Sequence, residues 1–252
     1  MDYKNVFVIT PVLNEVENIP NLLGSWKKMA DELTRYNFQF IFVDDGSNDG
    51  TAEKAQEISN LLNLDVVLLC HPKNKGPGFS FGTGFDYLSD KLKFDDLVVT
   101  IEGDNTSRVD TLKIMMERVL REDIDVALAS PLSYGGTVTN TKLHRIFLGH
   151  SAAALTKIIL GIRGLQTFTS FFRVYQGRVI LSLQKRYGTR ILEFNGFECM
   201  VELLKKITLF NFSITEVPMK LDTSVRKGKS KLKIFKTAIS YFRLFLRSRK
   251  WH

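Results

Sequence analysis

Acidic and amide side chains gather in three short segments, each directly after a run of apolar residues. The first is Pro11-Val12-Leu13-Asn14-Glu15, the second reads Asp-Asp-Gly-Ser at 44–47, and the third reads Glu-Gly-Asp-Asn at 102–105. Carboxylates accept hydrogen bonds from ribose hydroxyls, and as hard oxygen ligands they bind Mg²⁺ or Mn²⁺, which in turn bind phosphate. Any one segment alone could be turn or helix-cap chemistry. Three of them at successive strand ends favour a site for a nucleotide sugar.

The spacing of apolar residues predicts the elements that hold these segments. Short apolar strands are expected at 6–10, 38–43, 66–69, 97–101 and 126–129, with helices at 19–33, 51–61, 78–92 and 109–120. The strands begin about 25 to 35 residues apart, which is the size of βαβ units. We therefore predict an α/β fold, with a Rossmann-like, mostly parallel sheet that is covered by helices on both faces. Its site should lie at the carboxyl ends of the strands.

Beyond residue 130 the alternation of strands and helices is weaker. We expect helices at 143–160 and 197–207, strands at 170–175 and 212–217, and a basic amphipathic helix from residue 232 onward. The prediction is one domain over 1–222, in which 1–130 bind the nucleotide sugar and 131–222 bind the acceptor. Residues 223–252 then form a basic loop and an amphipathic helix.

Charge and composition limit the class of protein. The 252 residues carry a net charge of +8, yet 223–252 hold ten Lys or Arg and no Asp or Glu, which leaves 25 basic and 27 acidic residues elsewhere. Such a tail suits an anionic membrane surface, and its aromatic residues at helical spacing favour burial over base stacking, so we expect no nucleic-acid partner. Two distant cysteines exclude a disulfide framework and indicate a reducing compartment. No apolar run reaches the roughly 20 residues of a membrane span, and no signal peptide precedes the first predicted strand.

Several segments together resemble the family 2 glycosyltransferases of the GT-A fold. Two of them, TPVLNEVENI and VDDGSNDGT, are specific for that family, and an acidic-x-Asp loop follows. The family's Asn-x-Gly-x-Gly and Thr-Ser-Gly-Phe-Arg segments have counterparts in HPKNKGPGFSFGTG and TSFFRVY. The dolichol-phosphate mannosyltransferase branch has Glu-Val-Pro and Arg-x-x-Gly-x-Ser-Lys-Leu, which resemble ITEVPMKLDTSVRKGKSKL. The resemblance covers nearly the whole chain.

The resemblance implies roles for individual residues. The nucleotide sugar would be bound by Pro11, Asn14, Glu15, Asp44, Asp45, Gly78 and Asp104. The metal ion, Mg²⁺ or Mn²⁺, would be bound by Glu102 and Asp104. The phosphate of the donor or of a lipid acceptor would be bound by Arg173, Arg226, Ser230 and Lys231. The residues expected to carry catalysis are Asp104, Arg226 and Lys231, and Glu202 lies in a matching segment without an assigned role.

Three positions differ from the family pattern. Glu102 stands where the family usually has Asp and is one methylene longer, which would affect metal binding. Pro131 stands where Arg is common, and Thr167 stands where an acidic residue is usual. We expect these differences to bear on the acceptor and on activity more than on the fold.

The branch implies that an inverting, metal-dependent enzyme moves a hexose from GDP-mannose or a UDP-hexose to dolichyl or undecaprenyl phosphate. A phosphate monoester with a second pKa near ~6 is mostly a dianion at neutral pH and needs no general base. That suits a sequence in which His71, His144 and His150 are unconvincing bases. The enzyme would lie peripherally at the cytoplasmic face of a membrane. The resemblance to this branch also allows for a small membrane-spanning partner.

Other functions stay open at this point. One is a family 2 transferase that acts on a non-lipid glycan, and another is a degenerate protein that binds nucleotide sugars as a regulator. A sugar nucleotidyltransferase would want a Gly-rich, Arg-bearing loop after the first strand, and PVLNE is not such a loop.

Overall fold

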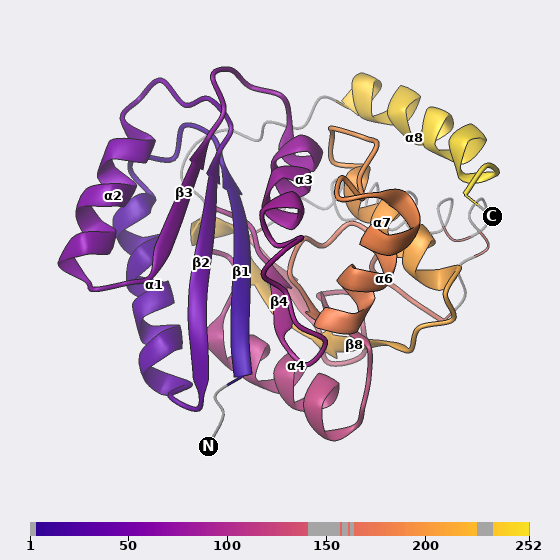
Figure 1. Cartoon of the computed structure of the whole chain (residues 1–252), viewed down its shortest axis with the longest axis horizontal. Coiled ribbons are helices and arrows are strands. Elements are labelled where there is room, and N and C mark those ends of the chain that lie inside the picture. The colour runs from indigo at the N-terminus through magenta and orange to yellow at the C-terminus, as the bar shows by residue number, and fades with distance from the viewer. Residues whose placement is uncertain (1–3, 141–156, 158–160, 162–163, 226–233, 252) are drawn as a thin grey trace.

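A seven-stranded sheet forms the centre of the computed structural model, which describes residues 4–140, 157, 161, 164–225 and 234–251. The strand order is β3-β2-β1-β4-β7-β5-β8, and all strands except β7 run parallel to one another. The expected helix at 143–160 falls almost wholly outside the described residues. The α/β prediction with a mostly parallel sheet is confirmed (Figure 1).

The bounds of the elements follow the predicted ones closely in the first half of the chain. The strands of the large sheet are β1 (Lys4–Val12), β2 (Tyr36–Asp44), β3 (Val66–Cys70), β4 (Leu97–Thr100), β5 (Val126–Ser130), β7 (Arg173–Gln176) and β8 (Ile214–Pro218). The described helices are α1 (Ile19–Glu32), α2 (Thr51–Leu61), α3 (Pro77–Tyr87), α4 (Val109–Arg121), α6 (Gly177–Tyr187), α7 (Cys199–Thr208) and α8 (Ile234–Ser248). A small second sheet pairs β6 (Thr137–Thr139) with β9 (Lys220–Asp222), and a 3₁₀ turn at Thr223–Val225 follows it.

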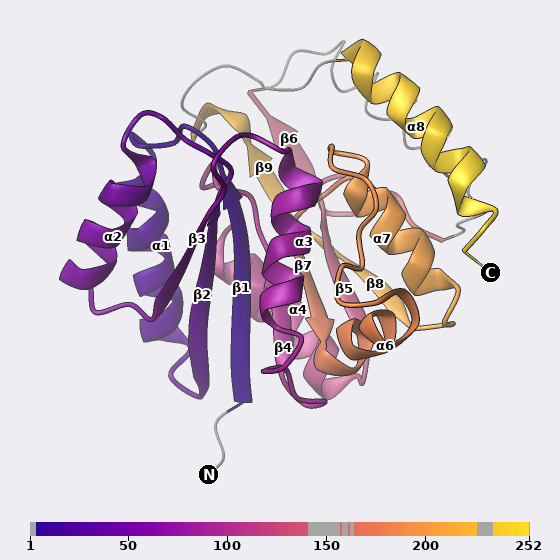
Figure 2. The same ribbon diagram turned by 45° about the horizontal axis from the view of Figure 1, so that its top comes forward.

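Helices cover both faces of the sheet, because alternate residues of a strand point to opposite faces. In β1, Val6 and Val8 pack with Trp26 of α1 and with α4, whereas Phe7 and Ile9 pack with α3. The helices α1, α2 and α4 therefore lie on one face, and α3, α6 and α7 lie on the other (Figure 2). Strands buried on both faces explain the continuous apolar runs in the sequence.

Two features in this region differ from the prediction or go beyond it. The helix expected over 78–92 ends at Tyr87, although Leu88 and Leu92 are buried, so turn residues complete the apolar pattern without being helical. The helix α6 was not predicted. It begins at Gly177, where a Cβ atom would lie 2.1 Å from the carbonyl oxygen of Lys93, so the glycine that weakens the helical pattern is required by packing.

The predicted C-terminal helix is confirmed as α8. Its inner side packs on α7 through the buried Leu244, and Trp251 just beyond the helix is also buried. In both views the amino end of α8 lies at the same end of the molecule as the carboxyl ends of β1, β2 and β3 (Figures 1 and 2). No helix within the described part of the chain is long and apolar enough to cross a membrane. The division of the chain at residue 222 stays a prediction.

Candidate functional site

The loops after β1 and β2 are joined by hydrogen bonds at the carboxyl edge of the sheet. The main-chain N–H of Asn14 donates to Ser47 Oγ at 2.8 Å, and Asn14 Oδ1 accepts from the N–H of Asn48 at 3.0 Å. The N–H of Glu15 donates to Thr51 Oγ1 at 2.9 Å, which ties the same loop to the start of α2. Asn14 adopts a positive φ of 49°, a conformation that asparagine tolerates better than most residues. Neighbouring parallel strands thus place Asn14 and Glu15 beside the second acidic segment.

Asp44 ends β2, Asp45 follows it directly, and both are almost fully buried. Asp44 Oδ1 accepts from the N–H of Ser47 at 3.0 Å and so shapes its own turn. Asp45 points to a different loop: Oδ1 accepts from the N–H of Lys75 at 3.0 Å, and Oδ2 accepts from the N–H of Gly76 at 2.7 Å. The Asp45 carboxylate therefore holds the residues that lead into α3.

The third acidic segment packs against the end of β1. A Cβ atom on Gly103 would lie 2.9 Å from the carbonyl oxygen of Pro11 and 2.7 Å from Val12, so only glycine permits this approach. The flanking Glu102 and Asp104 are half-buried. Asp104 Oδ1 accepts from Thr106 Oγ1 at 2.7 Å and from the N–H of Thr106 at 3.2 Å. The three acidic segments predicted to meet therefore do converge at one edge of the sheet.

The donor atoms around Glu102 and Asp104 fit Mg²⁺ or Mn²⁺. Both carboxylates and the hydroxyls of Thr106 and Ser107 are hard oxygen ligands, and they come from one short loop. Among the residues that the structure describes, no group of three or more His, Cys, Asp and Glu side chains could hold a metal ion. A site with two carboxylates is typical of Mg²⁺, which completes its coordination with water and substrate phosphate.

Gly78 lies in the first turn of α3 and contacts the loop before α7. Its N–H donates to the carbonyl oxygen of Asn195 at 2.8 Å, and a Cβ atom there would lie 2.2 Å from the carbonyl oxygen of Phe194. Gly76 has the same neighbour, since its Cβ atom would lie 2.4 Å from the Asn195 oxygen. These glycines allow two loops to meet at the start of α3. The expected contact of Gly78 with a nucleotide sugar stays a prediction.

Arg173 is completely buried at the start of β7. Its guanidinium donates to three main-chain carbonyl oxygens: Nε to Ser170 at 2.7 Å, Nη1 to Met200 at 2.9 Å and Nη2 to Phe168 at 2.7 Å. These contacts hold the segment before β7 against α7. The expected contact with phosphate stays a prediction, and the geometry favours a positioning role. The other expected phosphate ligands, Arg226, Ser230 and Lys231, lie outside the described residues.

Glu202 has a structural role that the sequence did not reveal. Its carboxylate is buried and accepts from the N–H groups of Glu193 and Phe194 at 2.8 and 3.0 Å, and from Lys206 Nζ at 2.6 Å. Burial raises the pKa of the Glu202 carboxyl, although the bonded Lys206 works in the opposite direction. Glu202 thereby fixes the loop that contacts Gly76 and Gly78.

Two further polar groups arrange the site and were not predicted from the sequence. Glu216 of β8 accepts from the N–H groups of Gln166 and Thr167 at 2.9 and 2.7 Å, which places Thr167 beside Ser130. His71 bridges Asp45 and Thr83 at 2.9 Å on each side. Glu216 lies in the Glu-Val-Pro segment, whose sequence assigned it no role, and nothing in the sequence links His71 to Thr83.

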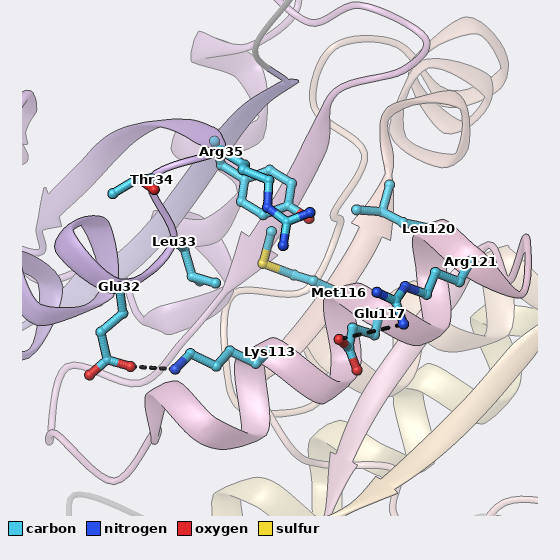
Figure 3. Close-up of a pocket in the computed structure, with 10 residues that line it drawn as sticks. Glu32, Leu33, Thr34, Arg35, Lys113, Met116, Glu117, Leu120 and Arg121 are labelled. Atoms are coloured by element: carbon cyan, nitrogen blue, oxygen red, sulfur yellow. Dashed lines mark hydrogen bonds and ion pairs between the residues drawn. The ribbon is translucent and has the colours of Figure 1, made fainter. Parts of the chain in front are cut away.

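A separate cavity of about 290 Å³ lies between α1 and α4. Figure 3 shows Glu32 and Lys113 paired on one side of it and Glu117 near Arg121 on the other. Tyr36, which also lines it, begins β2, so the cavity is at the amino end of the strands. It is therefore remote from the three acidic segments.

Comparison with known proteins assigns the class. The chain aligns over 88% of its length with a mannosyltransferase from Pyrobaculum calidifontis, solved with GDP-Man and Mn²⁺, with a TM-score of 0.57, 17% identity and 57% of that chain covered. This likeness and the acidic edge of the sheet define a GT-A fold. Residues 7–183 match the pattern of Glycosyl transferase family 2, so the chain belongs to that family.

Two curated relatives align over most of the chain. A polyprenol monophosphomannose synthase from Mycolicibacterium smegmatis is 27% identical over 230 residues, which are 91% of this chain and 81% of the relative. A dolichol-phosphate mannosyltransferase from Pyrococcus furiosus is 29% identical over 247 residues, or 98% of this chain. The chain spans 64% of the length of the Pyrococcus protein.

Proposed function

We propose that the chain transfers a hexose from GDP-mannose or a UDP-hexose to a polyprenyl phosphate. The observation that carries the proposal is the convergence of three acidic loops, in which Gly103 allows Glu102 and Asp104 to lie against the end of β1. The names of the two curated relatives support a lipid-phosphate acceptor. In this proposal Pro11, Asn14, Glu15, Asp44 and Asp45 bind the nucleoside side of the donor.

The donor diphosphate is negatively charged, so carboxylates bind it only through a cation. We assign Glu102 and Asp104 as ligands of Mg²⁺ or Mn²⁺, and the Mn²⁺ and GDP-Man complex of the Pyrobaculum protein supports this assignment. When bound, the cation stabilises the charge of the departing nucleoside diphosphate. Thr106 donates to Asp104 and thereby fixes the direction of that carboxylate.

The acceptor in this proposal is its own nucleophile. A lipid phosphate is mostly a dianion at neutral pH, because its second pKa is near ~6. No general base is needed, and attack in line with the leaving group inverts the anomeric carbon. The protein's contribution is to position the two substrates and to stabilise charge. Arg226, Ser230 and Lys231 are the proposed phosphate contacts.

The outer face of α8 is the proposed contact with the membrane. Ile239, Phe242 and Leu246 are 56%, 62% and 48% exposed, although large apolar side chains on a helix normally face a core. Arg243 of the same helix is exposed, and so is Arg249 just beyond its end. An apolar stripe flanked by cations is the pattern of a helix that lies in the surface of an anionic bilayer. We propose that the protein acts peripherally there, at the cytoplasmic face.

The transfer reaction is tested with the full chain, radiolabelled GDP-mannose or UDP-glucose, Mn²⁺ and a polyprenyl phosphate in liposomes. We expect label in the organic extract, and Asp104→Asn should reduce it at least about a hundredfold. The exposed Asp110 of α4 supplies the matched control Asp110→Asn, which should retain activity. Transfer only to a soluble glycan would overturn the proposed lipid acceptor and support the alternative, a transferase that acts on a non-lipid glycan. Nucleotide-sugar binding without transfer to any acceptor would indicate a regulatory protein.

The membrane contact is tested by flotation with anionic liposomes. The triple variant Ile239→Ser, Phe242→Ser, Leu246→Ser should lose binding, and high salt should weaken binding of the parent. Leu61→Ser on α2 is the control, because Leu61 is 78% exposed but lies apart from α8. These changes are preferable to deleting α8, whose buried Leu244 holds it to the body. A parent chain that does not bind anionic liposomes at low salt would overturn the membrane proposal.

A further inference from the structure

His71 lies directly after β3 and connects three elements. Its main-chain N–H donates to the carbonyl oxygen of Asp44 at 2.8 Å, which continues the pairing of β2 and β3. Its ring Nδ1 lies 2.9 Å from Asp45 Oδ1, and its Nε2 lies 2.9 Å from Thr83 Oγ1 in α3. The side chain is only 8% exposed. A buried imidazole with both nitrogens engaged is held in one orientation.

The Asp45 carboxylate, to which this imidazole bonds, already accepts most of its hydrogen bonds from within the chain. Asp45 accepts three hydrogen bonds, from His71 and from the N–H groups of Lys75 and Gly76. An ionised carboxylate has about four acceptor positions, and these three bonds use three of them. A ligand can therefore bond to Asp45 only at the remaining position. Because the carboxylate only accepts, Nδ1 of His71 carries the hydrogen of their bond.

The loop between His71 and α3 packs beside the proposed nucleoside site. A Cβ atom on Gly46 would lie 2.6 Å from the main chain of Lys73, so the loop covers the turn that follows Asp44 and Asp45. Phe79 of α3 meets the His71 ring edge-on, with ring centroids 5.0 Å apart. His71 therefore sets both the direction of Asp45 and the distance between the loop and α3.

We propose that His71 is a positioning residue for the binding of the nucleotide donor. It acts by holding Asp45 and Thr83 at a fixed distance and orientation relative to each other. The inference rests on the proposed function, in which this edge binds a nucleotide sugar. It assigns His71 no proton transfer and no contact with the sugar. Its loss should weaken donor binding and leave the acceptor KM unchanged.

Two substitutions separate the two ring contacts. The amide nitrogen of His71→Asn can take the place of Nδ1 and keep the bond to Asp45, whereas His71→Gln reaches the position of Nε2 and keeps the bond to Thr83. Thr83→Val removes the second contact from the other side without altering His71. Cys70→Ser, at the exposed neighbouring residue, is the control.

Two measurements on the full chain are added to the transfer assay, which gives the donor KM and the acceptor KM. Calorimetric titration uses GDP and UDP with Mn²⁺, and we expect His71→Gln to raise the Kd of the bound nucleotide about tenfold or more. His71→Asn and Thr83→Val should change it by less, and Cys70→Ser should leave it unchanged. Without any ligand, the amide hydrogens of Lys75 and Gly76 should exchange faster in His71→Gln than in His71→Asn.

The outcomes distinguish this inference from the proposed function. If the parent binds neither GDP nor UDP, the proposed function fails and His71 loses its role with it. If the parent binds a nucleotide but His71→Gln binds it equally well, only the inference about His71 is overturned. Equal rises in donor and acceptor KM would also overturn it, because they would indicate a general loss of structure. Should His71→Gln not fold, an unchanged Kd in both His71→Asn and Thr83→Val decides against the proposal.

Discussion

Two acidic side chains, Asp45 and Glu193, each hold another segment of the chain in place, and they do so by different means. Asp45 directly follows β2, its side chain is 4% exposed, and two of its three partners are main-chain N–H groups. Glu193 precedes α7, is 33% exposed, and its carboxylate bonds to side chains of α7, α8 and the residues just beyond: Lys206, Arg247 and Trp251. One carboxylate fixes a backbone, and the other fastens a helix.

The difference lies in what each carboxylate constrains. Main-chain donors move only with the loop itself, so Asp45 determines the path of residues 73–76 beside the proposed donor site. The partners of Glu193 are side-chain groups, and solvent screens the charge of one of them, the half-exposed Arg247, in part. Partial burial would raise the pKa of Glu193, but the bonds from Arg247, Lys206 and Trp251 hold it below its ordinary value. We expect changes at Asp45 to alter binding and changes at Glu193 to loosen α8.

The largest effect is expected from Asp45→Ala. It leaves two half-buried N–H groups and His71 without their acceptor, which should lower the free energy of unfolding by about 3 kcal/mol and abolish donor binding. Chemical denaturation and nucleotide titration measure both. Asp95→Ala, at an exposed carboxylate, is the control. An Asp45→Ala chain that binds the donor normally would show that the loop path does not depend on Asp45.

A smaller effect is expected from Trp251→Ala. The indole is 4% exposed and donates to Glu193 Oε1 at 2.6 Å, while Tyr187 Oη donates to the Trp251 carbonyl oxygen at 3.1 Å. We expect a loss of about 2 kcal/mol, less than for a buried tryptophan in mid-chain, because a terminal helix can detach locally. Hydrogen exchange should rise in α8 and stay unchanged in β1. Phe242→Ala, on the exposed face, should alter neither stability nor exchange.

The smallest effect is expected from Glu193→Gln, at about 1 kcal/mol near neutral pH. Because the folded chain lowers the pKa of Glu193, its contribution is present above the ordinary value of 4.5 and is lost as the pH falls through the lowered value. The stabilities of parent and variant should therefore converge in acid. Denaturation at several pH values measures this, with Glu117→Gln as the exposed control. A constant difference down to acid pH would mean that the charge of Glu193 does not stabilise α8.

The first half of the molecule could be predicted from the sequence because its signals are local. Apolar runs such as 38–43 are long enough to define strands, and the helices between them are the crossover connections that parallel strands need. Parallel strands bring their carboxyl ends to one edge, so the order of strands and helices along the chain is enough to place Asn14, Asp44 and Asp104 together. The close approaches that require Gly46 and Gly103, to Lys73 and to the end of β1, are seen only in the structure.

The second half depended on contacts between residues far apart in the chain. Insertion of β7 antiparallel between β4 and β5 is decided by pairing across the sheet, and α6 was missed because its first residue is a glycine required by packing. The sequence indicated a basic amphipathic helix near the C-terminus but not that Trp251 and Leu244 bury its inner side.

By itself the sequence determined the α/β class, the acidic edge and the family, because these rest on local pattern and on motifs of a few residues. Only the tertiary structure decided what the acidic groups contact. Asp45 was expected to bind a nucleoside, and the fold shows its oxygens already bonded to residues 71–76. The bridge from Asp45 through His71 to Thr83 spans two loops and a helix, and a hydrogen bond is set by distance in space. No spacing along the chain encodes such a distance until the sheet has brought its strands together.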